Sequence, residues 1–213
     1  MPYTTVNDLL NQNKNWAAAQ LETDPKFFSK LEKVQKPDYL WIGCSDSRVP
    51  ATEIVGLKPG EMFVHRNIAN IVPHGDLNCL SVIQYAVEVL GVSHIIVAGH
   101  YGCGGIRAAM EKADHGSIDN WLAYIKDIYS QNFNEINALP DPDQQADRLC
   151  ELNVMTQVRN VAKISSVQNA WRQGRDITVH GWIYRLSDGI LHDLNVNVNA
   201  TSQLHEAFQI EAD

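Results

Sequence analysis

Two short apolar runs, each ending in a loop of metal-binding residue types, constrain this chain more than any other feature. Residues 39–42 lead into Cys44-Ser45-Asp46-Ser47-Arg48, and residues 95–98 lead into His100-Tyr101-Gly102-Cys103. Short apolar runs of this kind are typical of buried strands. Loops at the carboxyl ends of neighbouring parallel strands meet at one edge of a sheet, where ligands bind. We therefore expect an α/β fold that brings the two loops together.

The ligand types in these loops favour zinc. Two thiols and one imidazole suit Zn²⁺, and Cys44, His100 and Cys103 leave the fourth tetrahedral position open, as in catalytic sites. The alternative is a closed structural site with Asp46 as fourth ligand. Structural sites usually staple segments too small to fold alone, whereas this chain has 213 residues, 45% of them hydrophobic. We therefore expect one catalytic zinc per subunit.

The glycine-rich turn at residues 99–105 lies where a phosphate-binding loop would lie. Its spacing fits neither G-x-G-x-x-G nor a loop ending in Gly-Lys-Ser/Thr. A tight turn that presents His100 and Cys103 together, with a helix packed close behind, explains the glycines better. A dinucleotide site is therefore disfavoured.

Asp46 and Arg48 stand two residues apart in the first loop. Arginine can hold a carboxylate by two parallel hydrogen bonds and so fix its orientation. A carboxylate held in this way beside a metal can orient a metal-bound nucleophile. The alternative is an exposed ion pair of little energetic value.

At these two loops the chain resembles the β-class carbonic anhydrases. The resemblance runs from about residue 38 to residue 107 and resumes at residues 180–184. It implies zinc-dependent, reversible hydration of carbon dioxide to bicarbonate and a proton, by attack of a zinc-bound hydroxide, with Asp46 and Arg48 in the active site. It also implies that Gln35, Tyr85 and Gly104 belong to the substrate pocket, the first two reaching it across a dimer interface.

Three further residues resemble a regulatory site. Trp41, Arg66 and Tyr184 match the bicarbonate pocket of the allosteric bacterial subgroup of the β class, and Gly43 is the small residue that this subgroup carries. Together they offer a guanidinium, an indole N–H and a phenol O–H to an anion. The resemblance implies a switch: open, with Asp46 on Arg48, or closed, with Asp46 as fourth zinc ligand. Rising pH should favour opening, and bicarbonate should favour closing.

The rest of the chain predicts one domain, residues 1–213, with a helical arm (1–36) and a zinc-binding α/β core (37–213). We expect a mainly parallel sheet with flanking helices and an antiparallel C-terminal strand. The expected strands are 39–43, 61–66, 94–99, 176–185 and the return 190–196; the expected helices are 6–21, one opening at Asp24-Pro25, 50–57, 78–90, 104–112 and most of 117–174. Because the arm is apolar on one face, we expect a homodimer, or a dimer of dimers.

Charge and cysteine content narrow the partners. The net charge of −8 argues against nucleic acid or an anionic membrane. We see no signal peptide and no run long enough to span a bilayer. Cys79 and Cys150 are expected to be buried free thiols, which is consistent with a reducing cytoplasmic compartment. The remaining histidines show no ligand spacing and are expected to be ordinary surface or core residues; one of them could shuttle protons.

Two other functions stay open at this point. The same zinc chemistry can act on carbonyl sulfide or carbon disulfide, and residue types do not separate these substrates from carbon dioxide. A zinc-dependent binding or regulatory module without turnover is the other alternative. The Asp46–Arg48 pair argues against it, because a structural module has no use for such a pair.

Overall fold

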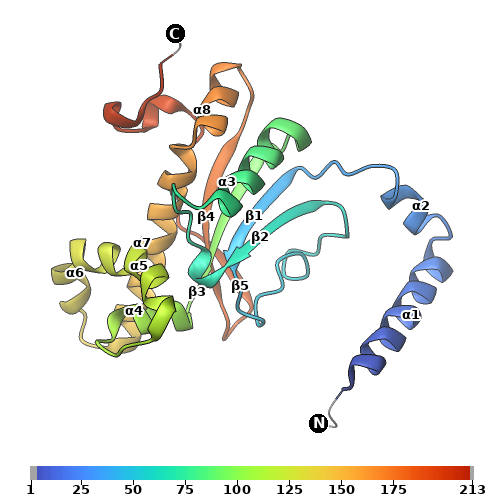
Figure 1. Cartoon of the computed structure of the whole chain (residues 1–213), viewed down its shortest axis with the longest axis horizontal. Helices are drawn as coiled ribbons and strands as arrows, with labels where there is room; N and C mark the ends of the chain where they lie inside the picture. Colours follow the sequence, from blue (N-terminus) through green and yellow to red (C-terminus); the bar gives the residue numbers. More distant parts are fainter. Residues whose placement is uncertain (1–3, 212–213) are drawn as a thin grey trace. The chain divides into compact units, whose positions relative to one another are not determined.

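A computed structural model describes residues 4–211 of the chain (Figure 1). The chain divides into two compact units, Met1–Gln35 and Lys36–Asp213. That both units make up one domain stays a prediction. Among the described residues, no helix has both the length and the apolar character needed to cross a bilayer.

The first unit holds two helices, α1 (Val6–Thr23) and α2 (Phe27–Leu31). Thr5 caps α1 and exchanges hydrogen bonds with Asp8, a capping box that satisfies two backbone donors. The aromatic rings of Trp16, Phe27 and Phe28 pack edge to face where the two helices meet. Helix α1 buries none of its residues, so within this unit its apolar side chains stay largely in solvent.

The start of the second helix differs from our expectation. We placed Asp24 at its N-cap and Pro25 at its first position, but the helix begins at Phe27. Asp24 instead terminates α1, where its backbone N–H donates to the carbonyl of Gln20, and its side chain accepts from the N–H of Lys26 at 3.0 Å. Asp24 and Pro25 thus form the turn between the helices.

The second unit is built on a five-stranded sheet with the order β2-β1-β3-β4-β5 (Figure 1). The first four strands are parallel and β5 runs antiparallel to β4, as the sequence predicted. The strands are β1 (Tyr39–Cys44), β2 (Met62–Asn67), β3 (His94–His100), β4 (Thr178–Arg185) and β5 (Ile190–Asp193). Strands β1 and β3 are neighbours, so the two predicted metal loops leave the same edge of the sheet side by side.

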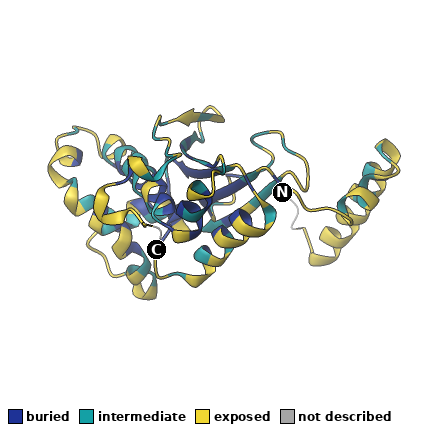
Figure 2. Cartoon of the chain, turned by 90° about the horizontal axis from the view of Figure 1, so that it is seen from above, coloured by how far each residue is buried: buried dark blue, intermediate teal, exposed yellow. Residues whose placement is uncertain are grey.

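Helices cover one face of this sheet. On that face, the side chains of Leu40 and Ile42 from β1 and of Ile95 and Val97 from β3 belong to the hydrophobic core between the sheet and the helices. Figure 2 shows the strands of the sheet as the buried centre of the unit. The helices and short turns of the unit are η1 (Ile68–Asn70), α3 (Leu77–Gln84), η2 (Tyr85–Leu90), α4 (Gly104–Met110), η3 (Gly116–Ile118), α5 (Asp119–Gln131), α6 (Phe133–Asn137), α7 (Pro142–Ala162), α8 (Ser165–Arg172), η4 (Thr201–Gln203) and η5 (Glu206–Phe208).

The opposite face of the sheet carries Trp41, Ile96 and Ala98, on which the segment after β1 packs through Ala51, Ile54 and Val55. We expected residues 50–57 to form a helix, and this was wrong. The segment is a series of turns in which the N–H of Leu57 bonds the carbonyl of Thr52. Packing of three apolar side chains on the sheet determines its path, and local helix propensity does not override that packing.

Several other boundaries differ from the prediction: β4 begins at Thr178 and not at residue 176, and α4 ends at Met110 and not at residue 112. The helix expected over 78–90 is present, but its second half, η2, winds more widely, as a π-helix, before Gly91 ends it in the left-handed conformation. The return strand β5 is shorter than expected because the chain turns at Asn195, whose φ is positive. A bridge between Val179 and Val198 continues the antiparallel pairing beyond that turn.

Candidate metal centre

The three predicted ligands meet at the carboxyl edge of the sheet. Cys44 is the last residue of β1, His100 is the last residue of β3, and Cys103 is the N-cap of α4. All three are buried, and one ligand atom from each lies within 4.8 Å of the others. The sulfur atoms of Cys44 and Cys103 are 3.9 Å apart. In the part of the chain that the structure describes, no other group of three His, Cys, Asp or Glu side chains is arranged in this way.

His100 is oriented for metal binding. Its Nδ1 lies 3.0 Å from the backbone carbonyl oxygen of Tyr101, which can only accept a hydrogen bond, so the proton resides on Nδ1. The other ring nitrogen, Nε2, is buried and has no hydrogen-bond partner among the described residues. A buried nitrogen lone pair facing two thiols is what a zinc ligand requires, and the residues therefore fit the metal.

The metal-free thiols share their protons unevenly. A hydrogen bond from Cys103 lowers the pKa of Cys44, against the effect of burial, and the same contact raises the pKa of Cys103. Burial alone would lower the pKa of His100, but the nearby Cys44 thiolate outweighs it and raises that pKa. The site thus holds protons that a divalent cation must displace.

One contact to the metal loop was not foreseen from the sequence. The backbone N–H of Ala69 points to the sulfur of Cys44 at 3.4 Å. Ala69 has φ 62° and Asn70 has φ 49°, a left-handed backbone that alanine seldom adopts. Asn153 on α7 donates to the carbonyl oxygen of Ala69 at 2.9 Å and holds it in place. The residue types of Ala69 and Asn70 do not predict this left-handed backbone, because contacts with neighbouring elements impose it.

The glycine-rich turn forms as predicted. Gly102 has φ 68°, which lets the chain reverse between His100 and Cys103. A Cβ atom at Gly105 would lie 2.9 Å from a methyl group of Ile68, so the lack of a side chain allows α4 to approach η1. The turn therefore serves the metal ligands, as expected, through both its direction and its close packing.

Asp46 and Arg48 form the predicted two-point pair. The arginine Nε donates to Oδ1 at 2.9 Å and Nη2 donates to Oδ2 at 2.6 Å, while the N–H of Arg48 adds a third bond to Oδ1. The guanidinium holds the pKa of Asp46 well below its usual range. The Asp46 Oδ2 atom also lies 3.7 Å from Nε2 of His100. The carboxylate is therefore ionised, oriented and adjacent to the metal position.

Trp41, Arg66 and Tyr184 lie on one face of the sheet, opposite to the helices, on β1, β2 and β4. The indole of Trp41 covers Gly43, where a Cβ atom would clash with its Nε1. Arg66 is already engaged: Nε donates to the carbonyl of Cys44 at 2.8 Å and Nη2 to that of Asp46 at 2.5 Å. No hydrogen bond joins these three side chains to one another within residues 4–211.

The expected substrate-pocket residues are not brought together within one chain. Gln35 is exposed and ends the first unit. Tyr85 is 45% exposed and packs against Phe63 on β2. The residue of β2 that pairs with Cys44 is Asn67. Phe63 lies four residues before Asn67, roughly 13 Å away along the strand. Gly104 alone adjoins the metal loop, as the first residue of α4, and a Cβ atom there would meet no described heavy atom within 4 Å.

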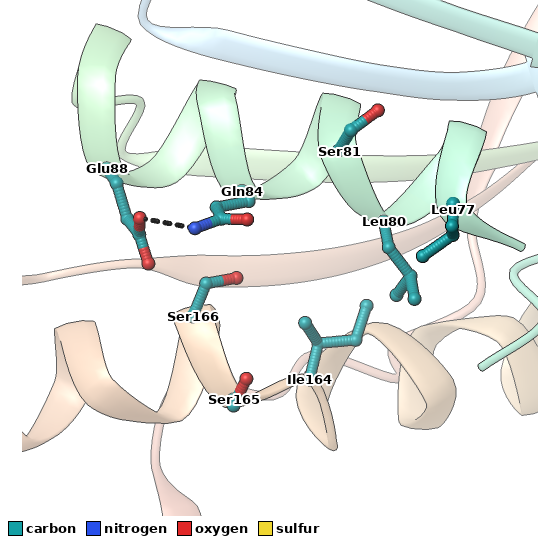
Figure 3. Close-up of a pocket in the computed structure, with 8 residues that line it drawn as sticks. All are labelled: Leu77, Leu80, Ser81, Gln84, Glu88, Ile164, Ser165 and Ser166. Atoms are coloured by element: carbon teal, nitrogen blue, oxygen red, sulfur yellow. Dashed lines mark hydrogen bonds between the residues drawn. The ribbon is translucent and has the colours of Figure 1, made fainter. Parts of the chain in front are cut away.

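The remaining cysteines and a separate groove have no part in this centre. Cys79 and Cys150 are buried free thiols, as expected, and burial raises the pKa of each to about 12. A groove of about 350 Å³ lies between α3 and α8 (Figure 3). Its single acid, Glu88, accepts a hydrogen bond from Gln84 at 2.8 Å, and the groove is lined by Leu77, Leu80, Ser81, Gln84, Glu88, Ile164, Ser165 and Ser166.

Comparison with known proteins identifies the family. Residues 39–191 match the carbonic anhydrase family. A carbonic anhydrase of Emericella nidulans is 48% identical over 193 residues, which cover 91% of this chain and 85% of that protein. One from the bacterium Pseudomonas aeruginosa is 34% identical over 80% of this chain and 79% of its own length.

Solved structures show the same fold. A tetrameric β-carbonic anhydrase of Sordaria macrospora superposes with a TM-score of 0.89 at 37% identity, covering 92% of this chain and 100% of that one. A Coccomyxa β-carbonic anhydrase bound to acetazolamide also gives 0.89, at 35% identity and with coverage of 94% and 91%. The fold and the Cys-His-Cys cluster define a zinc enzyme. The chain belongs to the β-class carbonic anhydrases.

Proposed function

We propose that the chain catalyses the reversible hydration of carbon dioxide at a zinc held by Cys44, His100 and Cys103. The observation that carries this proposal is the convergence of these buried ligand atoms, with the unpartnered Nε2 of His100 beside the Asp46 carboxylate. Zinc with three protein ligands lowers the pKa of water and supplies a nucleophile near neutral pH, a property for which carbonic anhydrases are the standard example.

The chain's own residues orient the reaction. Asp46 is ionised and fixed by Arg48 at 2.6 and 2.9 Å, so it accepts a hydrogen bond from the nucleophile and sets its direction toward carbon dioxide. The side chain of Arg48 is 58% exposed against 16% for Asp46. The arginine therefore lies at the solvent side of the pair, where the bicarbonate product leaves. No larger substrate has to be bound.

We propose further that the active unit is a homodimer or a dimer of dimers, located in the cytoplasm. The apolar side chains that α1 exposes, among them Val6, Leu9 and Leu10, support an interface of this kind. A Sordaria macrospora relative is tetrameric. In such an assembly Gln35 and Tyr85 of one subunit line the substrate pocket of another, beside Gly104.

We also propose regulation by pH and bicarbonate, as in the allosteric bacterial subgroup. The structure has Asp46 on Arg48, the arrangement of the open form. In the closed form Asp46 leaves Arg48 and takes the fourth metal position, a short move from its present place 3.7 Å from His100 Nε2. Bicarbonate held by Trp41, Arg66 and Tyr184 acts on this loop through Arg66, which already bonds the carbonyl of Asp46.

A stopped-flow assay of carbon dioxide hydration by zinc-loaded protein tests the activity, with carbonyl sulfide assayed in parallel. Hydration of carbon dioxide well above the buffer rate supports the proposal. Turnover of carbonyl sulfide alone would assign the site to the related substrate, and no turnover of either in a fully metallated protein would leave a zinc-binding module.

A further inference from the structure

The residue after the central metal ligand is fixed at three points. The backbone N–H of Tyr101 donates to the carbonyl of Tyr184 on β4 at 3.0 Å. Its phenol O–H donates to Oε1 of Glu151 on α7 at 2.8 Å. The guanidinium of Arg185 lies over its ring, 4.4 Å from the centroid. None of these contacts is needed to close the turn itself, which Gly102 already permits.

The acceptor of the tyrosine is itself held in place. Arg148 Nη1 donates to the second carboxylate oxygen of Glu151 at 2.8 Å, and its Nε donates to Glu135 on α6 at 2.7 Å. The side chain of Glu151 is 25% exposed and that of Arg148 is 31% exposed, so solvent screens these charges only in part. The network runs from α6 through α7 to the turn after β3.

The far end of this network meets the metal ligand. The carbonyl oxygen of Tyr101 accepts the hydrogen bond from Nδ1 of His100, and that bond sets both the tautomer and the ring orientation of the imidazole. The direction of the carbonyl follows from the peptide plane after Tyr101. Because the Tyr101 side chain is anchored at its hydroxyl, it restrains this peptide plane, whose carbonyl oxygen orients the imidazole of His100.

We propose that Glu151 and the Tyr101 hydroxyl are positioning residues that orient His100 toward the zinc. The inference rests on the ligand set proposed above. Partners that bond a metal ligand directly usually change metal affinity about 10- to 100-fold when removed. Because this anchor acts one residue further away, we expect an effect near the lower end of that range.

The test compares Tyr101→Phe with a matched control. Tyr101→Phe removes only the hydroxyl and keeps the ring under Arg185. Tyr129→Phe removes a phenol that also makes a side-chain hydrogen bond, to Asn137 on α6, and that makes no hydrogen bond to a metal ligand within residues 4–211. Zinc affinity, by chelator competition, should fall roughly 10-fold in Tyr101→Phe and stay within twofold of wild type in Tyr129→Phe. The visible spectrum of the cobalt-substituted protein should shift in Tyr101→Phe alone.

A second pair of variants keeps the proposal testable. Glu151→Gln retains an oxygen that can accept from Tyr101 and should preserve most of the affinity, whereas Glu151→Ala should resemble Tyr101→Phe. Wild-type zinc affinity and an unchanged cobalt spectrum in both Tyr101→Phe and Glu151→Ala would overturn the positioning role. His100→Ala separates a failure of the ligand assignment from a failure of the positioning role. If His100→Ala keeps its metal, the ligand assignment is wrong. If His100→Ala loses its metal while Tyr101→Phe binds zinc with normal affinity, only the positioning role is contradicted.

Discussion

Arg66 on β2 donates a hydrogen bond from Nη2 to the backbone carbonyl of Asp46 at 2.5 Å. Its Nε bonds the carbonyl of Cys44, two residues earlier. The side chain of Arg66, on the face of the sheet opposite to the helices, is thus hydrogen-bonded to the backbone of both Cys44 and Asp46. Any event that displaces the guanidinium of Arg66 must also disturb the loop that carries Asp46.

The first prediction concerns the ligands. Cys44→Ala, His100→Ala and Cys103→Ala should each lose zinc and activity together, because thiolate and imidazole ligands supply most of the metal-binding free energy. Cys79→Ala, which removes a buried thiol outside the cluster, should keep a full complement. Zinc content by elemental analysis is the measurement, and a Cys103→Ala protein with one zinc per subunit would show that the assignment is wrong.

Zinc affinity should rise with pH. The hydrogen bond with Cys44 raises the pKa of Cys103 in the metal-free site, so this thiol carries a proton that zinc must displace, and the pKa of His100 is also raised. Below the raised pKa of His100 the imidazolium cannot bind the metal, and the affinity falls. Calorimetry in buffers of different ionisation enthalpy should count about one proton released from Cys103 at mildly alkaline pH, and more as the pH falls and His100 becomes protonated. Binding without proton release contradicts this prediction.

Asp46→Asn should reduce turnover while zinc stays bound. The amide keeps the shape of the side chain but loses the charge that pairs with Arg48, and loss of a well-placed acid or base commonly costs about 10²-fold or more. Arg107→Ala, which breaks an exposed pair with Asp143 at 2.7 Å, serves as control and should retain activity. Equal turnover of Asp46→Asn and wild type at full metallation would remove Asp46 from the mechanism.

Removal of residues 1–34 should give insoluble or inactive protein. Val6, Leu9 and Leu10 are 76, 55 and 60% exposed, and side chains of this type belong in an interface between subunits. Light scattering after size-exclusion chromatography, together with the hydration assay, provides the measurement. A soluble, fully active monomer from this truncated chain would rule out the proposed dimer.

The regulatory proposal predicts a steep rise of activity through the mildly alkaline range. In the proposed switch, opening would return Asp46 to Arg48 and leave the fourth position to water, which zinc would make more acidic, so high pH would favour the open form. Tyr184→Phe should weaken inhibition by bicarbonate while zinc content stays the same. A one-proton pH profile in wild type, with bicarbonate purely competitive at the metal, would defeat the switch and leave the catalytic assignment intact.

The features that depend on side-chain type and on strand order could be predicted from the sequence. Cys44, His100 and Cys103 are recognisable by chemistry, and the parallel order of β1 and β3 follows from the alternation of strands and helices. Contacts imposed by tertiary packing were not predictable. The turn at residues 50–57 and the left-handed backbone of Ala69 both depend on elements distant in sequence.

The same limit applies to arginine. From the sequence, Arg66 is a free cation that could meet an anion, whereas in the fold two of its N–H groups already bond loop carbonyls. Backbone acceptors leave no trace in the residue types around them. The role of a charged side chain is therefore harder to predict than that of a metal ligand.

Helix α1 has a complete capping box yet buries none of its 18 residues. Most of the stability of a helix in a protein comes from tertiary packing of its apolar face. The order of α1 in solution should then depend on how much protein is present. Dilution below the dissociation constant of the assembly would let this helix fray, and proteases would cut the chain there first.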